Sequence, residues 1–259
     1  MRVATLNLAS GRDATGRSLD AAALAAALDG FGADVVAVQE VDRDQPRSHG
    51  VDQPAVVARA LEAVDWRWAP TVAGTPGPQH TWRAVDPTAL HGPGDGPAGP
   101  HYGIALFSRR PVRRWHVLDL GTGRGRLPVP TGRESPRLDW VSDEPRAAVA
   151  AELDGLTVVG THLSFAPITA GRQLVRIRDW ARGLPGPVVV AGDLNLVGPV
   201  PELVSGGTRL VRKPTFPAHD PRVQLDHVLA LGDLRGGDAR AWRLAFGDHR
   251  AVAVTLRPL

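Results

Sequence analysis

Carboxylates, amides and histidines that could bind a cation or carry a proton stand at the ends of apolar runs in this sequence. Asn7 lies near the end of the first run, and Glu40 closely follows the run at residues 34–38. A carboxylate in that position is either a solvated strand end or an oxygen ligand for a hard cation such as Mg2+. For a single residue the solvated strand end is the commoner case. The metal interpretation of Glu40 therefore needs further residues of the same chemistry.

Two more runs end in such residues. His162 follows the run at residues 156–160, and Asp193 follows the run at residues 187–190. Asn195 is two positions beyond Asp193, so an extended chain would place both side chains on one side. A carboxylate and an amide arranged in this way can hold a water molecule and an anionic oxygen.

Two Asp-His dipeptides complete the set: Asp226-His227 and Asp248-His249, the second directly before the last apolar run. Imidazole has an unperturbed pKa near neutrality, which suits proton transfer. Either dipeptide alone is weak evidence, because such pairs are common on protein surfaces. If Asp226 faces a site, His227 faces the opposite side of the strand and is interpreted as structural.

The elements that position these residues follow from the apolar patterns. Short β-branched runs alternate with helical patterns and turns, which is typical of a layered α/β protein. Helices are predicted at residues 18–28, 53–63 and 170–182. Strands are predicted at residues 3–8, 33–39, 103–108, 147–153, 156–162, 188–191, 223–229 and 251–256.

Two stretches rich in glycine and proline, residues 74–100 and 121–145, interrupt this pattern. They are predicted to be surface loops inserted into an ordered framework, since such residues disfavour central strands and helices. No repeat or long linker divides the chain, so residues 1–259 are expected to form one domain. The second loop carries the arginines Arg124, Arg126, Arg133 and Arg137.

The composition limits the class of protein. A chain of 259 residues with 43% hydrophobic and 22% charged residues is long enough for one sizeable core, which excludes disorder, collagen and coiled coil as descriptions of the whole chain. With no cysteine there is no disulfide, thiolate zinc site or cysteine nucleophile. Any metal must therefore be held by oxygen and imidazole.

The charge of the chain is nearly balanced despite a sequence pI near 10.3, because 30 basic residues stand against 27 acidic ones. Lys213 is the sole lysine, and arginine stays protonated in strong alkali, so a small excess raises the pI far. A net charge of +3 gives no global field that demands nucleic acid or an anionic membrane. No apolar run of about 18 residues and no secretory leader is present, so we expect a cytoplasmic protein without a transmembrane segment.

Taken together, the motifs resemble the endonuclease/exonuclease/phosphatase superfamily, which includes deoxyribonuclease I, exonuclease III and neutral sphingomyelinases. The resemblance runs from the first predicted strand to the last in family order. Its motifs are TLN at 5–7, QE at 39–40, GIALFSRRPV at 103–112, THLS at 161–164, GDLN at 192–195, LDHV at 225–228 and GDHRAV at 247–252.

The resemblance implies an α+β fold, a four-layer α/β/β/α sandwich in which two mixed β-sheets pack face to face with flanking helices. It also implies hydrolysis of phosphoester bonds with Mg2+, for which Mn2+ could substitute. Glu40 matches the principal metal carboxylate of the family, with Asn7 and Asp248 beside it. Mg2+ keeps several waters, so a ligand set this small is sufficient.

The remaining roles are also carried over from the resemblance. Asp193 and Asn195 match the pair that orients the attacking water and contacts the phosphate. His249 matches the catalytic histidine, and Asp226 matches the carboxylate that holds its ring. His162 matches a histidine of the deoxyribonuclease I and sphingomyelinase branches. Either Asp193 or His249 could act as the base, while His162 or a metal-bound water assists the leaving group.

Four further residues are candidates for substrate binding: Arg43, Arg47, Tyr102 and Arg146. The two arginines after Glu40 must border the metal, although an alternating-charge loop is usually only solvated. Tyr102 is as compatible with a plain loop end. Arg146 could grip a phosphate through its guanidinium fork, or could be a solvated strand-end arginine.

The sequence therefore predicts a metal-dependent phosphoesterase with an unassigned substrate. Nucleic acid would use the arginines of the second loop as a groove, and its binding would fall steeply with salt. A lipid headgroup, inositol phosphate or nucleotide would instead need a closed pocket. A catalytically silent module is disfavoured because the matched positions keep competent residues. No sequence feature predicts a protein partner.

Overall fold

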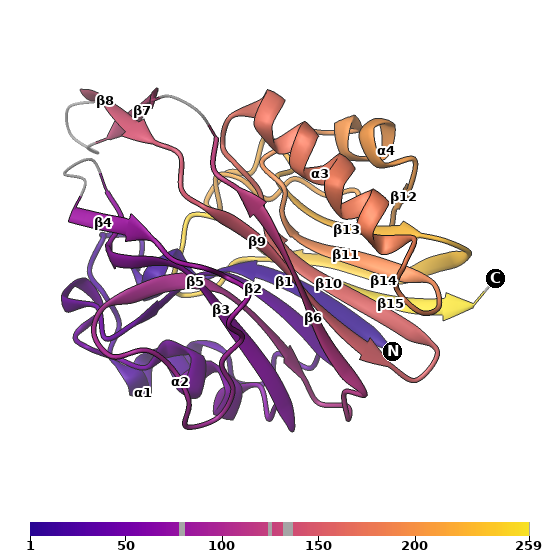
Figure 1. The fold of residues 1–259 in the computed structure, drawn as a ribbon, viewed down its shortest axis with the longest axis horizontal. Coiled ribbons are helices and arrows are strands. Elements are labelled where there is room, and N and C mark those ends of the chain that lie inside the picture. Colours follow the sequence, from indigo (N-terminus) through magenta and orange to yellow (C-terminus); the bar gives the residue numbers. More distant parts are fainter. Residues whose placement is uncertain (78–80, 124–125, 132–136, 259) are drawn as a thin grey trace.

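The computed structural model describes residues 1–77, 81–123, 126–131 and 137–258 (Figure 1). Three sheets are present in these ranges. The first contains β1 (Arg2–Asn7), β2 (Val35–Arg43), β3 (Asp65–Thr75), β4 (Thr81–Ala84), β5 (His101–Ser108), β14 (Leu234–Trp242) and β15 (Ala251–Pro258). Its seven strands have the order β14-β15-β1-β2-β5-β3-β4, in which β1 and β2 are parallel and the other neighbours are antiparallel.

The second sheet has six strands and is also mixed. It contains β6 (Arg114–Gly121), β9 (Arg146–Leu153), β10 (Leu156–His162), β11 (Val188–Asp193), β12 (Thr208–Arg209) and β13 (Asp226–Leu231). The order is β12-β13-β11-β10-β9-β6, and only β10 and β11 run parallel. A separate hairpin pairs β7 (Arg126–Thr131) with β8 (Arg137–Ser142).

Helices cover the outer face of each sheet (Figure 1). On the first sheet, α1 (Ala21–Ala27) and α2 (Gln53–Ala60) begin at Asp20 and Asp52, whose carboxylates accept backbone N–H bonds from the first turn. On the second sheet lie α3 (Pro167–Ala181) and α4 (Val200–Ser205). Two 3-10 turns, η1 (Ala9–Gly11) and η2 (Pro46–Ser48), follow β1 and β2.

The two sheets share an apolar interface built from valine, alanine and leucine of both inner faces. Val3 and Val35 of the first sheet lie in the same buried cluster as Val158 and Val189 of the second. Gly160 keeps the sheets close, because a Cβ there would lie 3.1 Å from the Cβ of Ala37. The predicted four-layer α/β/β/α sandwich with two mixed sheets is therefore confirmed.

Every predicted strand and helix is present, with ends shifted by a few residues. Other strands were not anticipated from the sequence. In β3, Pro70 lies at a register shift against β5, and β14 is an edge strand whose pairing with β15 is irregular after Gly237. Both strands contain residues that normally interrupt strands, and bulges or edges are where a sheet accepts them.

Apart from the last two residues of β3, the two stretches rich in glycine and proline contain no central strand within the described residues. Residues 74–100 include β4 at the edge of the first sheet, and residues 121–145 include the β7–β8 hairpin. Arg124 and Arg133 lie outside the described residues, as do the side chains of Arg126 and Arg137. No helix in the described part of the chain is long and apolar enough to cross a membrane.

Gly192 lets β10 and β11, two strands that carry site residues, approach each other closely, and this gives a stability prediction. A Cβ at Gly192 in β11 would lie 2.1 Å from the carbonyl oxygen of Thr161 in β10. We expect Gly192→Ala to lower the free energy of unfolding by about 1–3 kcal/mol, as overpacking does. Gly171→Ala is the control, because its Cβ would meet nothing within 4 Å in α3 and should stabilise that helix by about 0.5–1 kcal/mol. Urea unfolding measures both, and equal effects would contradict the packing argument.

Candidate active site

Strands from both sheets end at the same rim of the sandwich. Asn7 is the last residue of β1, His162 the last of β10 and Asp193 the last of β11. Asp226 is the first residue of antiparallel β13 and pairs in register with Asp193. Because parallel neighbours end together and an antiparallel neighbour begins there, the topology brings these side chains to one edge.

Glu40 reaches this rim through a local distortion of β2. The pairing of β2 with β5 shifts register between Val38 and Val41, and Glu40 has a left-handed φ of 56°. A bulge of this kind re-aims a side chain and costs backbone energy, and such strain is concentrated at functional sites. The result is a half-buried carboxylate directed at the rim.

Asn7 joins the carboxylates of the two sheets. Its Nδ2 donates to Glu40 Oε1 at 3.1 Å and to Asp193 Oδ2 at 3.2 Å, while its Oδ1 accepts from Ala9 N at 2.9 Å. Two carboxylates therefore converge on one polar group, although their mutual repulsion would separate them in water. An oxygen-rich donor set without sulfur fits a hard divalent cation.

Asn195 lies beside Asp193 by a different geometry from the one expected. Its φ is 50°, so the chain is not extended here, and the amide N–H of Asn195 turns back to donate to Asp193 Oδ1 at 3.0 Å. The side-chain Nδ2 donates to Leu163 O at 3.0 Å. Asparagine tolerates the left-handed conformation better than most residues, which is one physical reason for its presence.

His249 is held by two carboxylates. Its Nδ1 donates to Asp226 Oδ2 at 2.9 Å and lies 3.6 Å from Asp193 Oδ2. Burial lowers the pKa of His249, but Asp226 and Asp193 outweigh it and raise the pKa well above its usual value. The imidazole is therefore protonated at neutral pH. Burial in turn raises the pKa of Asp193 to about 7, against the opposing effect of His249.

His162 differs from His249 in charge. Burial, followed by the positive charges of Arg146 and His249, lowers the pKa of His162 well below its usual value, so this ring is neutral. Its Nε2 lies 3.7 Å from Asp193 Oδ2, which is too long for a hydrogen bond. Its Nδ1 is buried and has no partner among the residues that the structure describes.

These side chains face a cavity of about 410 Å³. Of the predicted residues it is lined by Glu40, Arg47, Tyr102, Arg146, His162, Asp193, Asn195 and His249. Asp226 is fully buried behind His249, and Asn7 is 4% exposed. The structure therefore brings carboxylate, amide and imidazole side chains of both sheets together at one hollow.

The model of the Endonuclease/Exonuclease/phosphatase family matches residues 4–249 of the sequence. The chain belongs to this family. Comparison with curated protein sequences finds no match.

Solved structures of low sequence identity share the fold. A family member from Beutenbergia cavernae DSM 12333 has a TM-score of 0.68 at 24% identity, covering 100% of this chain and 71% of that one. The mannosyl-6-phosphatase Bt3783 of Bacteroides thetaiotaomicron VPI-5482 has a TM-score of 0.60 at 13% identity, with 99% of both chains covered. Sphingomyelinase C from Streptomyces griseocarneus has a TM-score of 0.58 at 19% identity, with 98% of both chains covered.

Two predicted residues of this family member lie away from the cavity. Asp248 is exposed and lines a separate hollow of about 220 Å³ beside Arg12 and Asp13. Arg43 pairs with Asp52 at 3.3 Å and donates to Asp95 O at 2.8 Å. Neither residue lines the cavity, and the sequence pattern does not reveal this.

The other three substrate-binding candidates lie in the cavity wall. Arg47 makes a bidentate pair with Asp42, with Nη2–Oδ1 at 2.7 Å and Nε–Oδ2 at 2.9 Å, and its guanidinium lies over the Tyr102 ring. Burial, together with nearby carboxylates, raises the pKa of Tyr102 well above its usual value, so its hydroxyl is neutral. Arg146 is buried, with Nη1 3.6 Å from Glu144 Oε2.

Glu144, Arg12 and Phe165 also line the cavity and were not anticipated. Burial raises the pKa of Glu144, although Arg146 opposes this. The sequence feature that could have indicated Glu144 is its position two residues before Arg146, a predicted substrate-binding residue. Arg12 follows the η1 turn and Phe165 follows the THLS motif, and no sequence pattern predicts either of them as a cavity residue. His227, interpreted as structural, is buried with its Nε2 2.9 Å from Leu196 O.

Asp193, Asp226 and His249 also offer ligand atoms within 4.8 Å of one another, the geometry of a small metal site. The hydrogen bond from His249 Nδ1 to Asp226 argues against a cation there, because a protonated imidazole has no lone pair to donate. We interpret this trio as a group that holds a proton.

The His249–Asp226 pair gives a titration prediction. Asp226→Asn removes the carboxylate that raises the pKa of His249, so the imidazole should lose its proton at a lower pH than in the wild type. NMR titration of the His249 ring measures this. Asp233→Asn is the matched control. Asp233 is exposed in the turn between β13 and β14, so its substitution should leave the His249 titration unchanged.

The same pair has a consequence for stability. Because the pKa of His249 is raised in the folded state, its contribution to stability is fully present below the unfolded value near 6.5 and is lost as pH rises through the folded pKa. The wild type should therefore lose more stability than Asp226→Asn on going from neutral to alkaline pH. Parallel pH curves for the two proteins would contradict the pairing.

Proposed function

We propose that this family member is a divalent-metal-dependent hydrolase that cleaves a small phosphoester by attack of water on phosphorus. The observation that carries the proposal is the convergence of Glu40, Asp193, His162 and His249 on one cavity. A phosphodiester is an anion that repels nucleophiles, so hydrolysis needs charge neutralisation, a positioned water and help for the leaving oxygen. The four side chains offer each of these functions.

Glu40 and Asn7 are the residues that would hold Mg2+, with Mn2+ as a substitute. The cation, when bound, neutralises charge on the non-bridging oxygens of the phosphate. Glu40 would supply a carboxylate oxygen to the cation, and Asn7, which contacts Glu40, is the neighbouring residue whose amide oxygen could supply a second ligand. With few protein ligands, the site leaves room for water and substrate.

Asp193 is the better candidate for the base that accepts the water proton. Its raised pKa, about 7, gives it affinity for a proton at neutral pH, whereas His249 is already protonated. Charged His249 would instead bind a phosphoryl oxygen through Nε2 while Asp226 holds its Nδ1. As the oxygen of water bonds to phosphorus, its proton passes to Asp193 and the bond to the leaving oxygen breaks.

His162 would act on the leaving oxygen. As a neutral ring it can donate one hydrogen bond but carries no spare proton before the substrate binds. An incoming phosphate would favour its protonated form, because an opposite charge nearby raises the pKa of an imidazole. His162 would then stabilise the leaving oxygen and deliver a proton to it.

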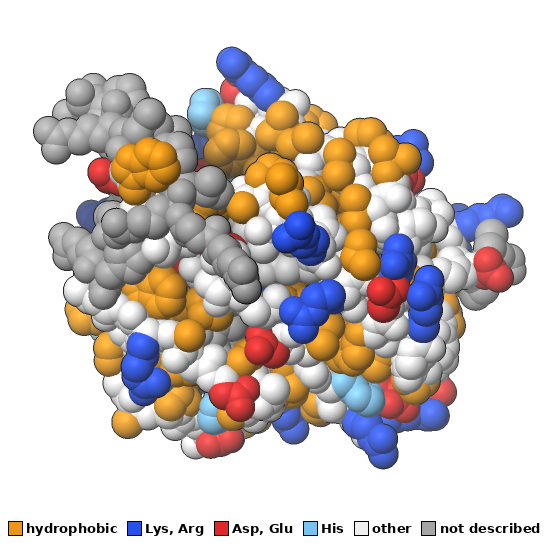
Figure 2. Space-filling view, turned by 45° about the horizontal axis from the view of Figure 1, so that its top comes forward, with side chains coloured by type: hydrophobic (Ala, Val, Ile, Leu, Met, Phe, Trp, Pro, Cys, Tyr) orange, Lys and Arg blue, Asp and Glu red, His pale blue; other side chains and the backbone are white. Residues whose placement is uncertain are grey.

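A small substrate fits the cavity better than a nucleic-acid duplex. Pro76, Val141 and Phe165 line a partly open hollow of about 410 Å³, the size of a small-molecule site. Among the described residues on the face seen in Figure 2, Lys and Arg side chains are scattered among apolar and neutral ones and form no continuous band. The structures named a mannosyl-6-phosphatase and a sphingomyelinase support a small phosphate-bearing group as the substrate.

The metal role gives an activity prediction. Glu40→Gln should lower kcat/KM on the order of 10²–10³-fold, as the loss of one strong electrostatic contact in an active site does. Glu62→Gln is the matched control, because Glu62 is exposed and only pairs with Arg109 at the surface. Hydrolysis is measured with Mg2+ and with chelator on bis-p-nitrophenyl phosphate, hexose 6-phosphates, sphingomyelin, phosphoinositides, RNA and supercoiled DNA. Unchanged turnover in Glu40→Gln would contradict the metal assignment.

The same panel tests the substrate class. We expect cleavage of a small phosphoester with weak dependence on salt, because few phosphates contact the protein. Preferred cleavage of DNA or RNA, with a rate that falls steeply as salt rises, would identify a nuclease instead.

The role of His162 is tested by leaving-group dependence. His162→Ala should slow a substrate with an alkoxide leaving group more than one that releases p-nitrophenolate, because only the poor leaving group needs a proton. A loss of about 10²-fold or more is expected for the alkyl ester. His116→Ala, at the half-buried β6 edge, is the control for losing an imidazole elsewhere. Equal loss on both substrates would overturn the acid role and leave His162 as a binding residue.

A further inference from the structure

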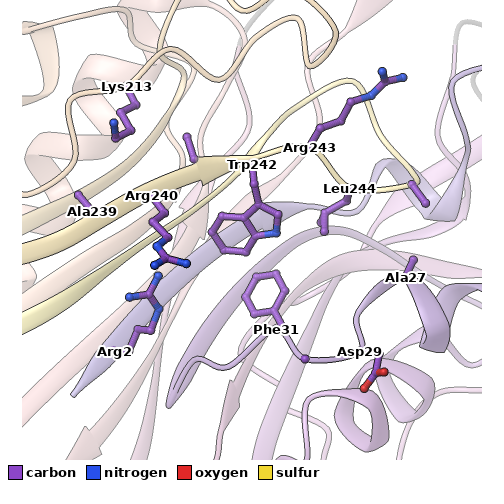
Figure 3. A pocket seen from close by; sticks show the side chains of 13 residues that line it. Arg2, Ala27, Asp29, Phe31, Lys213, Ala239, Arg240, Trp242, Arg243 and Leu244 are labelled. Atoms are coloured by element: carbon purple, nitrogen blue, oxygen red, sulfur yellow. The ribbon is translucent and has the colours of Figure 1, made fainter.

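A second hollow of about 600 Å³ lies outside the active site (Figure 3). One wall is the edge strand β14 with the residues after it, and the other is the chain just after α1. Trp242 and Leu244 from the first wall pack against the buried layer under α1 and α2, so the hollow opens on the outer face of the seven-stranded sheet. Arg2, at the start of β1, also lines it, and Asn7 at the active site is about 17 Å further along that strand.

Positive charge dominates the hollow. Arg2, Lys213, Arg240 and Arg243 line it, against a single carboxylate, Asp29. In the described part of the chain none of these four cations pairs with a carboxylate, whereas many other arginines do. Arg2 uses only weak contacts from Nη1, 3.4 Å to Asp238 O and 3.3 Å to Thr255 Oγ1.

The two guanidinium groups of Arg2 and Arg240 point toward each other in Figure 3. Like charges that point toward each other without a carboxylate between them repel, and an anion between them would reduce that repulsion. Guanidinium forks match the geometry of phosphate oxygens through paired hydrogen bonds. The arrangement therefore favours an anionic group with several oxygens.

An aromatic pair forms the floor beside these cations. Phe31 and Trp242 have ring centroids 5.0 Å apart and an interplanar angle of 52°. Both are half-buried, and neither belongs to the exposed large apolar side chains of the described surface. Insertion into a membrane needs protruding apolar groups, so this recessed pair fits a planar ring that enters the hollow better than it fits a lipid surface.

We infer that this hollow binds a nucleotide-sized organic phosphate, with the phosphate between Arg2 and Arg240 and a planar ring against Trp242. The volume is in the range of small-ligand pockets and holds one such molecule. Stacking on an aromatic side chain suits any nucleobase, since every base has a π-face. The site uses no residue of the catalytic cavity, so it is independent of the proposed hydrolysis.

Calorimetric titration of the full-length protein in chelator tests the site with four probes: adenosine 5′-monophosphate, ribose 5-phosphate, adenosine and inorganic phosphate. We expect the monophosphate to bind at least tenfold more tightly than each of the other three, because it alone supplies both groups. No binding of the monophosphate at millimolar concentration, or equal binding of inorganic phosphate, would overturn the inference.

Two charge variants on the same strand locate the binding. Arg240→Glu should weaken the monophosphate at least tenfold, because it replaces one side of the phosphate clamp. Arg235→Glu is the matched control, an exposed arginine of β14 that does not line the hollow, and should leave the affinity unchanged. Full affinity in Arg240→Glu would place the nucleotide in the catalytic cavity or elsewhere and overturn the proposal.

Trp242→Leu separates the ring contact from the charge contact. It should bring the affinity for adenosine 5′-monophosphate down to that for ribose 5-phosphate while leaving the latter unchanged. An unaltered preference for the monophosphate would contradict the stacking contact. Thermal unfolding of each variant checks that it folds.

Discussion

The site depends on holding several carboxylates close together in a place with little water. Asp193 and Asp226 are buried beside each other, and Glu40 converges on Asp193 through Asn7. Their repulsion is offset by the protonated imidazole of His249, which contacts both aspartates. The pKa directions follow from this one constraint: the imidazole gains affinity for its proton, and the most crowded carboxylate loses some of its acidity.

The fold enforces that constraint through strand ends. Each sheet contributes one parallel pair, β1 with β2 and β10 with β11, so two strands of each sheet end at the same rim. Gly160 and Gly192 allow the close approach of sheet to sheet and strand to strand that this rim requires. The bulge at Glu40 then directs this side chain to the rim, which a regular strand would not do. The backbone strain is placed at the residue that would bind the cation.

The ends of the central strands could also be predicted from the sequence. Apolar runs closed by Asn7, Glu40, His162 and Asp193 are local patterns, so the central strands and most of the cavity's predicted residues were visible. What could not be seen depends on tertiary contacts. The left-handed turn at Asn195, the exposure of Asp248 and the inward position of Glu144 arise from loop paths that have no period. Edge strands such as β14 were missed because their glycines and arginines resemble a loop.

The two hollows differ in how their charged side chains are paired. In the candidate active-site cavity Arg47 and Arg146 are paired with acids, and the carboxylates of Glu40, Asp193 and Glu144 share the wall with Arg12 and His249. A phosphate entering there meets carboxylates as well as cations, and a divalent cation on Glu40, as proposed above, would offset the repulsion from those carboxylates. The outer hollow has four unpaired cations and one acid among its described residues, so an anion needs no metal to bind. A near-neutral total charge thus conceals two differently charged sites.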